Sequence, residues 1–392
     1  MRLLPRVCIF AVSVAICLAL QSLSCLAATP SEGAPAAPES VAAIDPLAKQ
    51  VDEAIRVSSR RYLNAGTHTP WQIIHGVLAL RQDYQLQLGD KKVNAIEWVS
   101  DGPSFGGEQW FQKTQFGGRA HPYSYNYAFE GHPNQFLAYM SMSHLPLEHT
   151  FKAGNDTITV GDMVRNAQAE VNTAEEQTWT LWALSHYLES DAEWQNRYGE
   201  PWSIERLVEI EARRQVQTAA CGGTHSLFAI SNARNVYFMT GKPLRGAWLE
   251  ADQKIKRYVQ ETRYNQNSDG TFSTNYFRGR GFSNDFVTRI GTTGHTLEFL
   301  MLALPEPSLK EEWLRRAVAA LCTDLIEHRK EPAECGALYH GLDALVIYRE
   351  RTNPQTTVAS DQTSAATDLT GDPDESAELP VDAPRPGPAE SH

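Results

Sequence analysis

The sequence contains few cysteines, six in 392 residues, and three of them lie within the first 25 residues. The remaining three are Cys221, Cys322 and Cys335. Three cysteines allow at most one disulfide and leave at least one free thiol. This excludes a small scaffold held together by disulfides. We interpret Cys221 and Cys335 either as small buried residues at helix starts or as one disulfide between neighbouring helical hairpins. Cys322 lies in an apolar helical stretch and is expected in the core.

The sequence also lacks a stripe of Lys and Arg residues. Its formal net charge is −12, and the segment from Thr352 to His392 carries eight acidic residues against one Arg. Since nucleic-acid-binding proteins typically carry a basic stripe, no nucleic-acid partner is expected. We expect residues 352–392 to form a disordered acidic tail, because too few large apolar residues occur there to offset the entropy lost on ordering.

The apolar run Val7–Leu20 is too short to span a bilayer as a helix. It follows Arg2 and Arg6 and precedes a cluster of small residues, which is the layout of a secretory signal peptide. The sequence therefore predicts a signal peptide over residues 1–28 and export to the periplasm, the envelope or the medium. No transmembrane helix is expected in the mature chain, and a lipid anchor at Cys25 is the alternative to ordinary cleavage.

Composition divides the rest of the chain. Residues 29–44 are rich in Pro, Ala, Ser and Glu, which is typical of a linker. Residues 45–351 carry the apolar periodicity of a folded domain. Strand signals within this domain are weak, and only Phe151–Ile158 predicts a small hairpin.

Apolar spacing and cap signals predict six pairs of helices in this domain. A capping box formed by Thr173 and Glu176 is expected to start the second helix of the third pair. The pairs are Pro46–Leu63 with a helix starting at Thr69-Pro70, Lys91–Ser100 with Pro133–Met142, Val160–Val171 with Ala174–Glu189, Ser203–Gln217 with Thr224–Met239, Leu244–Thr262 with Gly294–Leu304, and Leu309–Arg329 with Glu334–Glu350.

The two helices of each pair differ in character. The first is generally amphipathic and charged, whereas the second is apolar on nearly every side, as in Thr296–Leu304. A helix that is apolar all round is buried, so the alternation predicts two concentric rings of helices. The expected fold class is all-α, an (α/α)6 toroid of six helical hairpins with long loops over one mouth. An open solenoid would show a more regular repeat.

Polar side chains gather at the starts of the predicted inner helices, which would meet at one mouth of the ring. Histidines and carboxylates there could transfer protons at neutral pH. The predicted catalytic residues are His225, His295, His340, Glu298 and Glu176. The predicted substrate-binding residues are His75, His132, Glu130, Trp110 and Arg289. For each histidine the alternative is a structural hydrogen bond between helices.

Two long loops carry many aromatic residues. The first, residues 101–128, includes Trp110, and its aromatic rings could stack on a sugar or an apolar ligand. The second precedes Arg289, whose guanidinium could pair with a carboxylate or phosphate. The alternative is that both loops only pack onto the ring.

Thiol and imidazole donors recur at the same helix starts. Cys221, His225, His295, Cys335 and His340 together would suit zinc. However, neither C-x-x-C nor H-E-x-x-H spacing occurs in the sequence. We therefore assign no metal ligands and leave the cofactor unknown.

Two short stretches resemble known families. Gln266–Phe272 resembles the Q-x-x-D-G-x-W element of the terpenoid cyclase and protein prenyltransferase superfamily, with Phe in place of Trp. This resemblance implies an α/α toroid, but the D-x-D-D acid motif and the zinc pattern of these enzymes are missing. Gly294–Glu298 resembles the G-H-x-x-E stretch of (α/α)6 sugar epimerases, which implies a catalytic His295. The segments Trp71–Gly76 and Ala220–His225 also resemble a family of exported bacterial proteins, which implies no particular activity.

Three functions remain open from the sequence. The first is a carbohydrate-active enzyme, whether hydrolase, lyase or epimerase, that uses histidines and carboxylates at the ring mouth to bind and convert a saccharide or another small molecule. The second is a non-catalytic binding or scaffold protein of the envelope. The third is an isoprenoid cyclase-like enzyme, which would need a deep apolar cavity and a strong acid.

Overall fold

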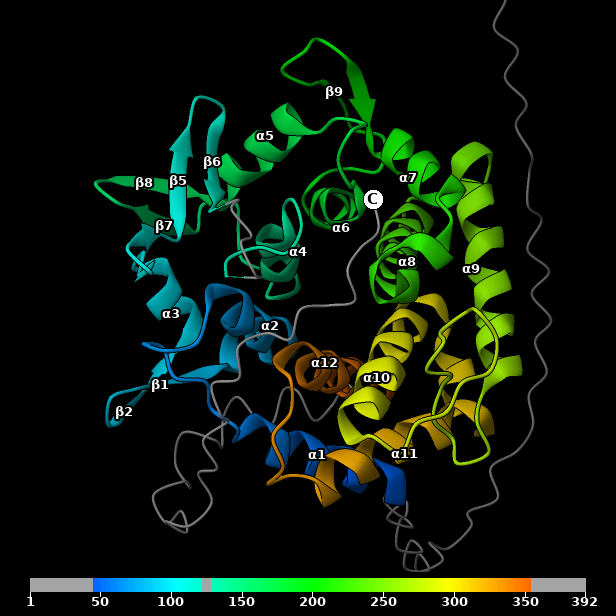
Figure 1. The fold of residues 1–392 in the computed structure, drawn as a ribbon. Helices are drawn as coiled ribbons and strands as arrows, with labels where there is room; N and C mark the ends of the chain where they lie inside the picture. The colour runs from blue at the N-terminus through cyan, green and yellow to red at the C-terminus, as the bar shows by residue number, and fades with distance from the viewer. Residues whose placement is uncertain (1–44, 122–127, 354–392) are drawn as a thin grey trace, which may run out of the picture. The chain divides into compact units, whose positions relative to one another are not determined.

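The computed structural model describes residues 45–121 and 128–353, and within them the chain is mostly helical (Figure 1). The predicted signal peptide, the linker and residues 354–392 of the predicted tail lie outside the described residues. The α-helices are α1 (Pro46–Ser59), α2 (Pro70–Leu80), α3 (Ala95–Ser100), α4 (Gln135–Met142), α5 (Val160–Glu170), α6 (Thr178–Tyr187), α7 (Ile204–Arg213), α8 (Thr224–Met239), α9 (Gly246–Asn265), α10 (Phe286–Ala303), α11 (Glu312–Glu327) and α12 (Cys335–Thr352).

The even-numbered helices make a closed circuit of contacts. Each of α2, α4, α6, α8 and α10 packs against the next even-numbered helix, and α12 packs back against α2. These helices are seen nearly end-on at the centre of Figure 1, with the odd-numbered helices outside them. Burial follows the same division, because Cys335–Tyr348 of α12 is buried at every position. By contrast, α7 buries only one face, at Ile204, Leu207, Val208 and Glu211.

Local caps explain where the central helices begin. Thr69 and Gln72 form a capping box at the start of α2, as the Thr69-Pro70 signal predicts. Glu334 accepts hydrogen bonds from two backbone N–H groups at the start of α12. Asp285 caps α10 by accepting from the N–H of Thr288, so this helix begins at Phe286, about two turns before the predicted start at Gly294.

Two other predicted boundaries are wrong for identifiable reasons. The capping box at Thr173 does not form, because the Glu176 carboxylate binds His132 instead, and α6 begins only at Thr178. The predicted helix Lys91–Ser100 is half strand, since residues 91–94 pair with residues 85–88 and Asn94 then caps α3.

The prediction of an all-α fold is wrong in one respect, because five short antiparallel hairpins occur in the described residues. One of them lies at the predicted Phe151–Ile158 stretch. The other four were missed because strands of two to four residues are too short to show a period of two. The hairpins are β1 (Gln85–Leu88) with β2 (Lys91–Asn94), β3 (Ser104–Phe105) with β4 (Glu108–Gln109), β5 (Phe111–Thr114) with β6 (Gly117–Ala120), β7 (Thr150–Ala153) with β8 (Asp156–Thr159), and β9 (Glu193–Gln195) with β10 (Pro201–Ser203).

Helices α10 and α12 come unusually close to each other. A Cβ atom on Gly294 would lie 2.6 Å from the Cα atom of Gly341, so only glycine permits this approach. The crossing places His295 beside His340, with 3.9 Å between the ring centroids. Glycine at this position therefore decides which side chains meet at the centre.

Two further predictions concern cysteines and membranes. Cys221, Cys322 and Cys335 form no disulfide, so the alternative of a bridge between hairpins is not realised. Cys322 is buried in α11, as predicted. Among the described residues, no helix combines the length and apolar character needed to cross a membrane.

Candidate functional site

Four histidines from four helices meet at the centre of the helix circuit. His75 of α2, His225 of α8, His295 of α10 and His340 of α12 are all buried. The ring centroid of His340 lies 5.3 Å from that of His75, 5.1 Å from that of His225 and 3.9 Å from that of His295. The structure therefore brings together all three predicted catalytic histidines and one of the predicted substrate-binding residues. We call these four residues the histidine cluster.

Hydrogen bonds orient three rings of the histidine cluster. Nδ1 of His75 lies 2.6 Å from the carbonyl oxygen of Trp71, and Nδ1 of His295 lies 2.7 Å from that of Gly291. A carbonyl can only accept, so both Nδ1 atoms carry the proton and both Nε2 atoms keep a lone pair. Nδ1 of His340 contacts both carboxyl oxygens of Glu298, at 2.8 and 2.9 Å.

Burial keeps the histidine cluster uncharged. Burial, with a contribution from neighbouring imidazoles, lowers the pKa values of His75, His225 and His295 far below the ordinary value, and burial lowers the pKa of His340 to about 3. Burial likewise raises the pKa of Glu298 to about 8. The cluster is therefore a set of neutral donors and acceptors at neutral pH.

An acidic residue and an arginine lie next to Glu298. Burial raises the pKa of Asp343 well above its ordinary value, and the neighbouring carboxyl group of Glu298 adds to this effect. Arg81 at the end of α2 reaches Asp343 at 2.6 Å. Removing this arginine would leave a buried carboxyl group without its ion-pair partner.

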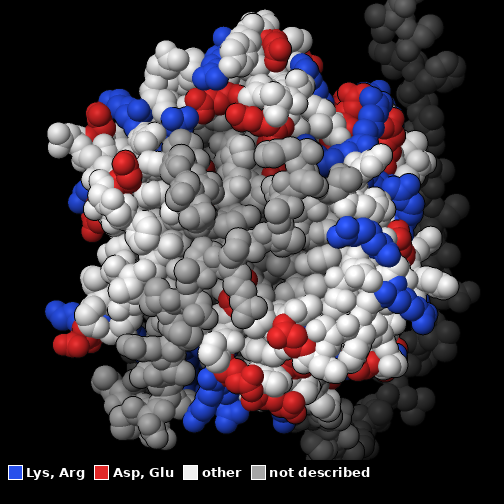
Figure 2. Space-filling model, in the orientation of Figure 1, with Lys and Arg blue, Asp and Glu red and all other residues white. Residues whose placement is uncertain are grey.

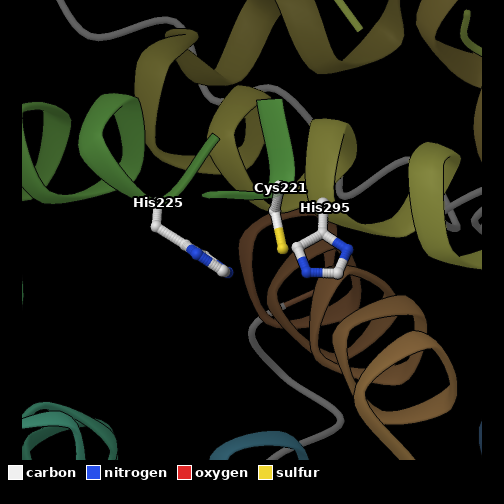
Figure 3. Close-up of side chains that lie close together, drawn as sticks. All are labelled: Cys221, His225 and His295. Atoms are coloured by element: carbon white, nitrogen blue, oxygen red, sulfur yellow. The ribbon is translucent and has the colours of Figure 1, made fainter. Parts of the chain in front are cut away.

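Cys221 joins the histidine cluster through an unusual backbone. Its φ is 50° and its ψ is 37°, a left-handed conformation that costs about 1–2 kcal/mol for a residue other than glycine. Gly222 and Gly223 continue in positive φ, and α8 starts directly afterwards. The donor atoms of Cys221, His225 and His295 all lie within 4.8 Å of one another, and Figure 3 shows the thiol pointing toward the gap between the two rings.

One nitrogen of the histidine cluster is left without a partner. Nε2 of His225 is buried and makes no hydrogen bond with any of the described residues. A buried polar atom left unsatisfied costs about 1–3 kcal/mol, so such an atom calls for a functional explanation.

A polar cavity of about 370 Å³ lies between α4, α5 and α6. Acidic side chains gather near α5 on the face seen in Figure 2. The charged and imidazole side chains that line the cavity are Arg119, Glu130, His132, Glu170, Glu175, Glu176 and Arg197. Three of the predicted site residues, Glu130, His132 and Glu176, are thus in one cavity.

The carboxyl groups of this cavity differ in their ionisation. Nδ1 of His132 lies 2.6 Å from Oε2 of Glu176. Burial by itself would raise the pKa of Glu176. This hydrogen bond and the charges of His132 and Arg214 outweigh burial and hold that pKa below its ordinary value. Burial raises the pKa of Glu130 to about 8, against the opposing effect of a 2.6 Å hydrogen bond from the N–H of Phe136. At pH 7, Glu176 is a carboxylate and Glu130 a carboxylic acid.

The two sites are neighbours but separate. The ring of His132 stacks on Trp179 at 5.0 Å, and Trp179 in turn lies 4.8 Å from the ring of His225. The predicted catalytic set is accordingly divided, with Glu176 in the cavity and the remaining predicted catalytic residues in or beside the histidine cluster.

Two predicted substrate-binding residues lie elsewhere. Trp110 is buried and packs edge-on against Trp98, outside the lining of the polar cavity. Arg289 pairs with Asp269 at 2.7 Å and with Asp324 at 3.0 Å, so its guanidinium already has carboxylate partners. All three tyrosines of the first aromatic loop, at positions 123, 125 and 127, lie outside the described residues.

Sequence reasoning missed several residues of both sites. Tyr139 of α4 places its hydroxyl 3.3 Å from Nε2 of His75 and 3.4 Å from Nε2 of His340. Arg81 and Arg119 were missed because each lies at the end of an element, far in sequence from its partner. Tyr139 is a polar residue within an apolar helix, and this is the signal that could have identified it.

Comparison of the chain with protein-family models, with curated proteins and with solved structures gives no match. Function is therefore argued from the geometry of the two sites alone.

Proposed function

We propose that this chain is an exported hydrolase that acts on a neutral saccharide in the cavity between α4, α5 and α6. We further propose that residues 45–351 are an (α/α)6 toroid. The closed circuit of contacts from α2 through α12 and back to α2 supports the toroid. The signal-like segment at residues 1–28 is the basis for export.

The observation that carries the proposal is the contrast between two carboxyl groups of one cavity. Glu130 is held as an acid and Glu176 as a carboxylate, although both are glutamates. Environments that push two pKa values apart in this way assign one residue as general acid and the other as general base or nucleophile. Glycoside hydrolysis requires such a pair.

The proposed reaction uses these groups as follows. Oε1 of Glu130 accepts the N–H of Phe136, so we place on Oε2 the proton that passes to the glycosidic oxygen as the bond to the anomeric carbon breaks. The Glu176 carboxylate, oriented by His132, takes a proton from the water that attacks the anomeric carbon. One water is consumed, the leaving group departs as an alcohol and the other sugar as a hemiacetal, and the proton gained by Glu176 returns to Glu130 through solvent.

The charges of the cavity favour a neutral substrate. Arg119 lies 3.3 Å and Arg197 lies 3.6 Å from Glu170, so both lining arginines are already paired with a carboxylate. Glu130, Glu175 and Glu176 also line the cavity, so carboxyl groups outnumber arginines there, which disfavours the anionic uronate that a lyase would need. A cavity lined by this many charged groups is also unsuited to an isoprenoid chain.

A second candidate function is saccharide binding without turnover. The centre of the helix circuit is filled by the buried histidine cluster and Tyr139. A filled centre favours a scaffold or binding protein, in which the same cavity would hold a sugar and the two carboxyl groups would only form hydrogen bonds to it.

The test separates protonation of the leaving group from binding. We expect the protein to hydrolyse some members of a panel of dinitrophenyl and methyl glycosides of neutral sugars. Glu130→Gln should lower turnover of methyl glycosides by about 10²–10⁴-fold. It should spare dinitrophenyl glycosides, because their leaving group needs no proton.

The control is Glu175→Gln. Glu175 is an exposed carboxylate that lines the same cavity, so its substitution should change turnover little. Glu176→Gln should lower turnover of both substrate classes. Binding of sugars without turnover would favour the second candidate, and neither binding nor turnover would refute the assignment of the cavity to saccharides.

A further inference from the structure

We infer that Cys221, His225 and His295 bind one divalent zinc ion at the centre of the helix circuit, a site separate from the saccharide cavity. One thiol and two imidazoles from α8, α10 and the turn before α8 place their donor atoms within 4.8 Å of one another (Figure 3). Three protein ligands leave one position of a tetrahedral zinc ion for a water molecule.

The separation of the donor atoms is close to what zinc requires. Zinc–sulfur bonds of about 2.3 Å and zinc–nitrogen bonds of about 2.0–2.1 Å place tetrahedral donors about 3.4–3.7 Å apart. The widest separation here is 4.8 Å, so an approach of about 1 Å by side-chain rotation completes the site. Movements of this size need no change in the helices.

The backbone before α8 serves to direct the thiol. Cys221 holds a left-handed conformation although it carries a Cβ atom, and strained residues of this kind concentrate at functional sites. Gly222 lies directly under Tyr276, since a Cβ on this glycine would lie 2.3 Å from the tyrosine ring. A Cβ on Gly223 would likewise lie 2.4 Å from the carbonyl oxygen of Val216. Packing against both glycines therefore holds the turn in the conformation in which the sulfur faces His225 and His295.

The hydrogen bonds of the two imidazoles match those of metal ligands. Nδ1 of His295 donates to the carbonyl of Gly291, which leaves Nε2 with its lone pair available. Nε2 of His225 is buried and has no hydrogen-bond partner in residues 45–121 and 128–353, so a bound ion would satisfy an atom that these residues leave unsatisfied.

Neighbouring groups suit a buried cation. Binding replaces the thiol proton of Cys221, which passes to solvent, so the zinc–thiolate unit carries one net positive charge. Glu298 lies one turn along α10 from His295 and bonds to His340, whose ring contacts both histidine ligands. Because a nearby cation favours the charged form of a carboxyl group, Glu298 or Asp343 can lose its proton on metal binding and supply compensating negative charge close to the ion.

The experiment titrates the purified protein, after treatment with a chelator, with zinc chloride and with cobalt(II) chloride. We expect one zinc ion per chain by calorimetry. Cobalt should give a thiolate-to-cobalt charge-transfer band together with intense visible bands typical of tetrahedral coordination. Cobalt bands without a sulfur contribution, or no metal bound at all, would overturn the inference.

Matched cysteine variants identify the ligand. Cys221→Ser should weaken zinc binding by more than about 100-fold, since loss of a residue that only hydrogen-bonds to a metal ligand already costs about 10–100-fold. Cys335→Ser changes a buried thiol outside the group and should leave the affinity within a few-fold. Equal affinity for both variants would overturn the site. If Cys221→Ser does not fold, the cobalt spectrum of the unmodified protein decides.

The copper alternative and the hydrolase proposal are tested separately. Cysteine with two histidines also binds copper(II) in electron-transfer sites, and copper(II) binds most such donor sets more tightly than zinc. An intense blue copper band together with failure to bind zinc would make copper the occupant and overturn the inference. Glu130→Gln should bind zinc normally, because Glu130 lies in the saccharide cavity. A failure to hydrolyse glycosides would therefore count against the hydrolase proposal without bearing on zinc binding.

Discussion

Replacing Gly294 with alanine tests the contact on which the histidine cluster depends. Gly294 of α10 faces Gly341 of α12, and a Cβ at position 294 would lie 2.6 Å from Cα and 2.7 Å from N of Gly341. These are backbone atoms, which cannot rotate out of the way. The two helices must therefore separate to admit one methyl group.

The expected cost follows from two opposing terms. Overpacking a core costs about 1–3 kcal/mol, and a contact with backbone belongs at the upper end of that range. Alanine in a helix interior is about 1 kcal/mol more favourable than glycine. We expect Gly294→Ala to lower the free energy of unfolding by about 2 kcal/mol. The same displacement should also widen the 3.9 Å contact between His295 and His340.

The assay is urea denaturation followed by tryptophan fluorescence, with Gly341→Ala as the matched control. A Cβ on Gly341 would meet Cδ1 of Leu321 at 3.4 Å and the carbonyl oxygen of Ile290 at 3.7 Å, which are ordinary contacts. This variant should be as stable as the unmodified protein or more stable by up to about 1 kcal/mol. If Gly294→Ala proved equally stable, the close crossing of α10 and α12 would be refuted.

Two further predictions concern buried charge. Burial raises the pKa of Glu130 from 4.5 to about 8, so the folded chain keeps a proton that the unfolded chain releases, and stability should fall as pH rises through this window. Glu130→Gln should make that fall shallower, and identical slopes in urea unfolding between about pH 5 and pH 8 would contradict the assignment. Arg81→Met leaves Asp343 buried without its 2.6 Å partner and should cost about 3 kcal/mol by thermal or urea unfolding. Arg56 and Glu53 form an exposed ion pair, which should contribute under about 1 kcal/mol to stability. A loss of stability in Arg56→Ala as large as that in Arg81→Met would contradict the role of burial.

Helix boundaries were predictable where the signal is local. The bounds predicted for Thr224–Met239 match α8 as found, because Gly222-Gly223 interrupts the chain directly before it. The start of α10 was missed, since Asp285 caps it within a loop that lacks apolar periodicity. The capping box predicted at Thr173 does not form, because Glu176 binds His132, which lies 44 residues away in sequence.

The candidate sites were predictable only in part. The sequence pointed to histidines at buried helices, and those of α2, α8, α10 and α12 do meet. It offered no reason to separate Glu176 from Glu298, because both are glutamates near the start or middle of an apolar helix. The structure places one beside His132 in a cavity and the other beside His340 in the core.

The sequence by itself determined which segments are helical and which helices are buried, because caps and apolar periodicity act over a few residues of the same chain. Tertiary structure alone decided which donor atoms meet. Cys221, His225 and His295 are brought together by a left-handed turn and by the contact of α8 with α10, while Gly294 sets the distance to His340. Such meetings depend on how closely two helices can approach, and that distance is set by packing across the core rather than by neighbours in sequence.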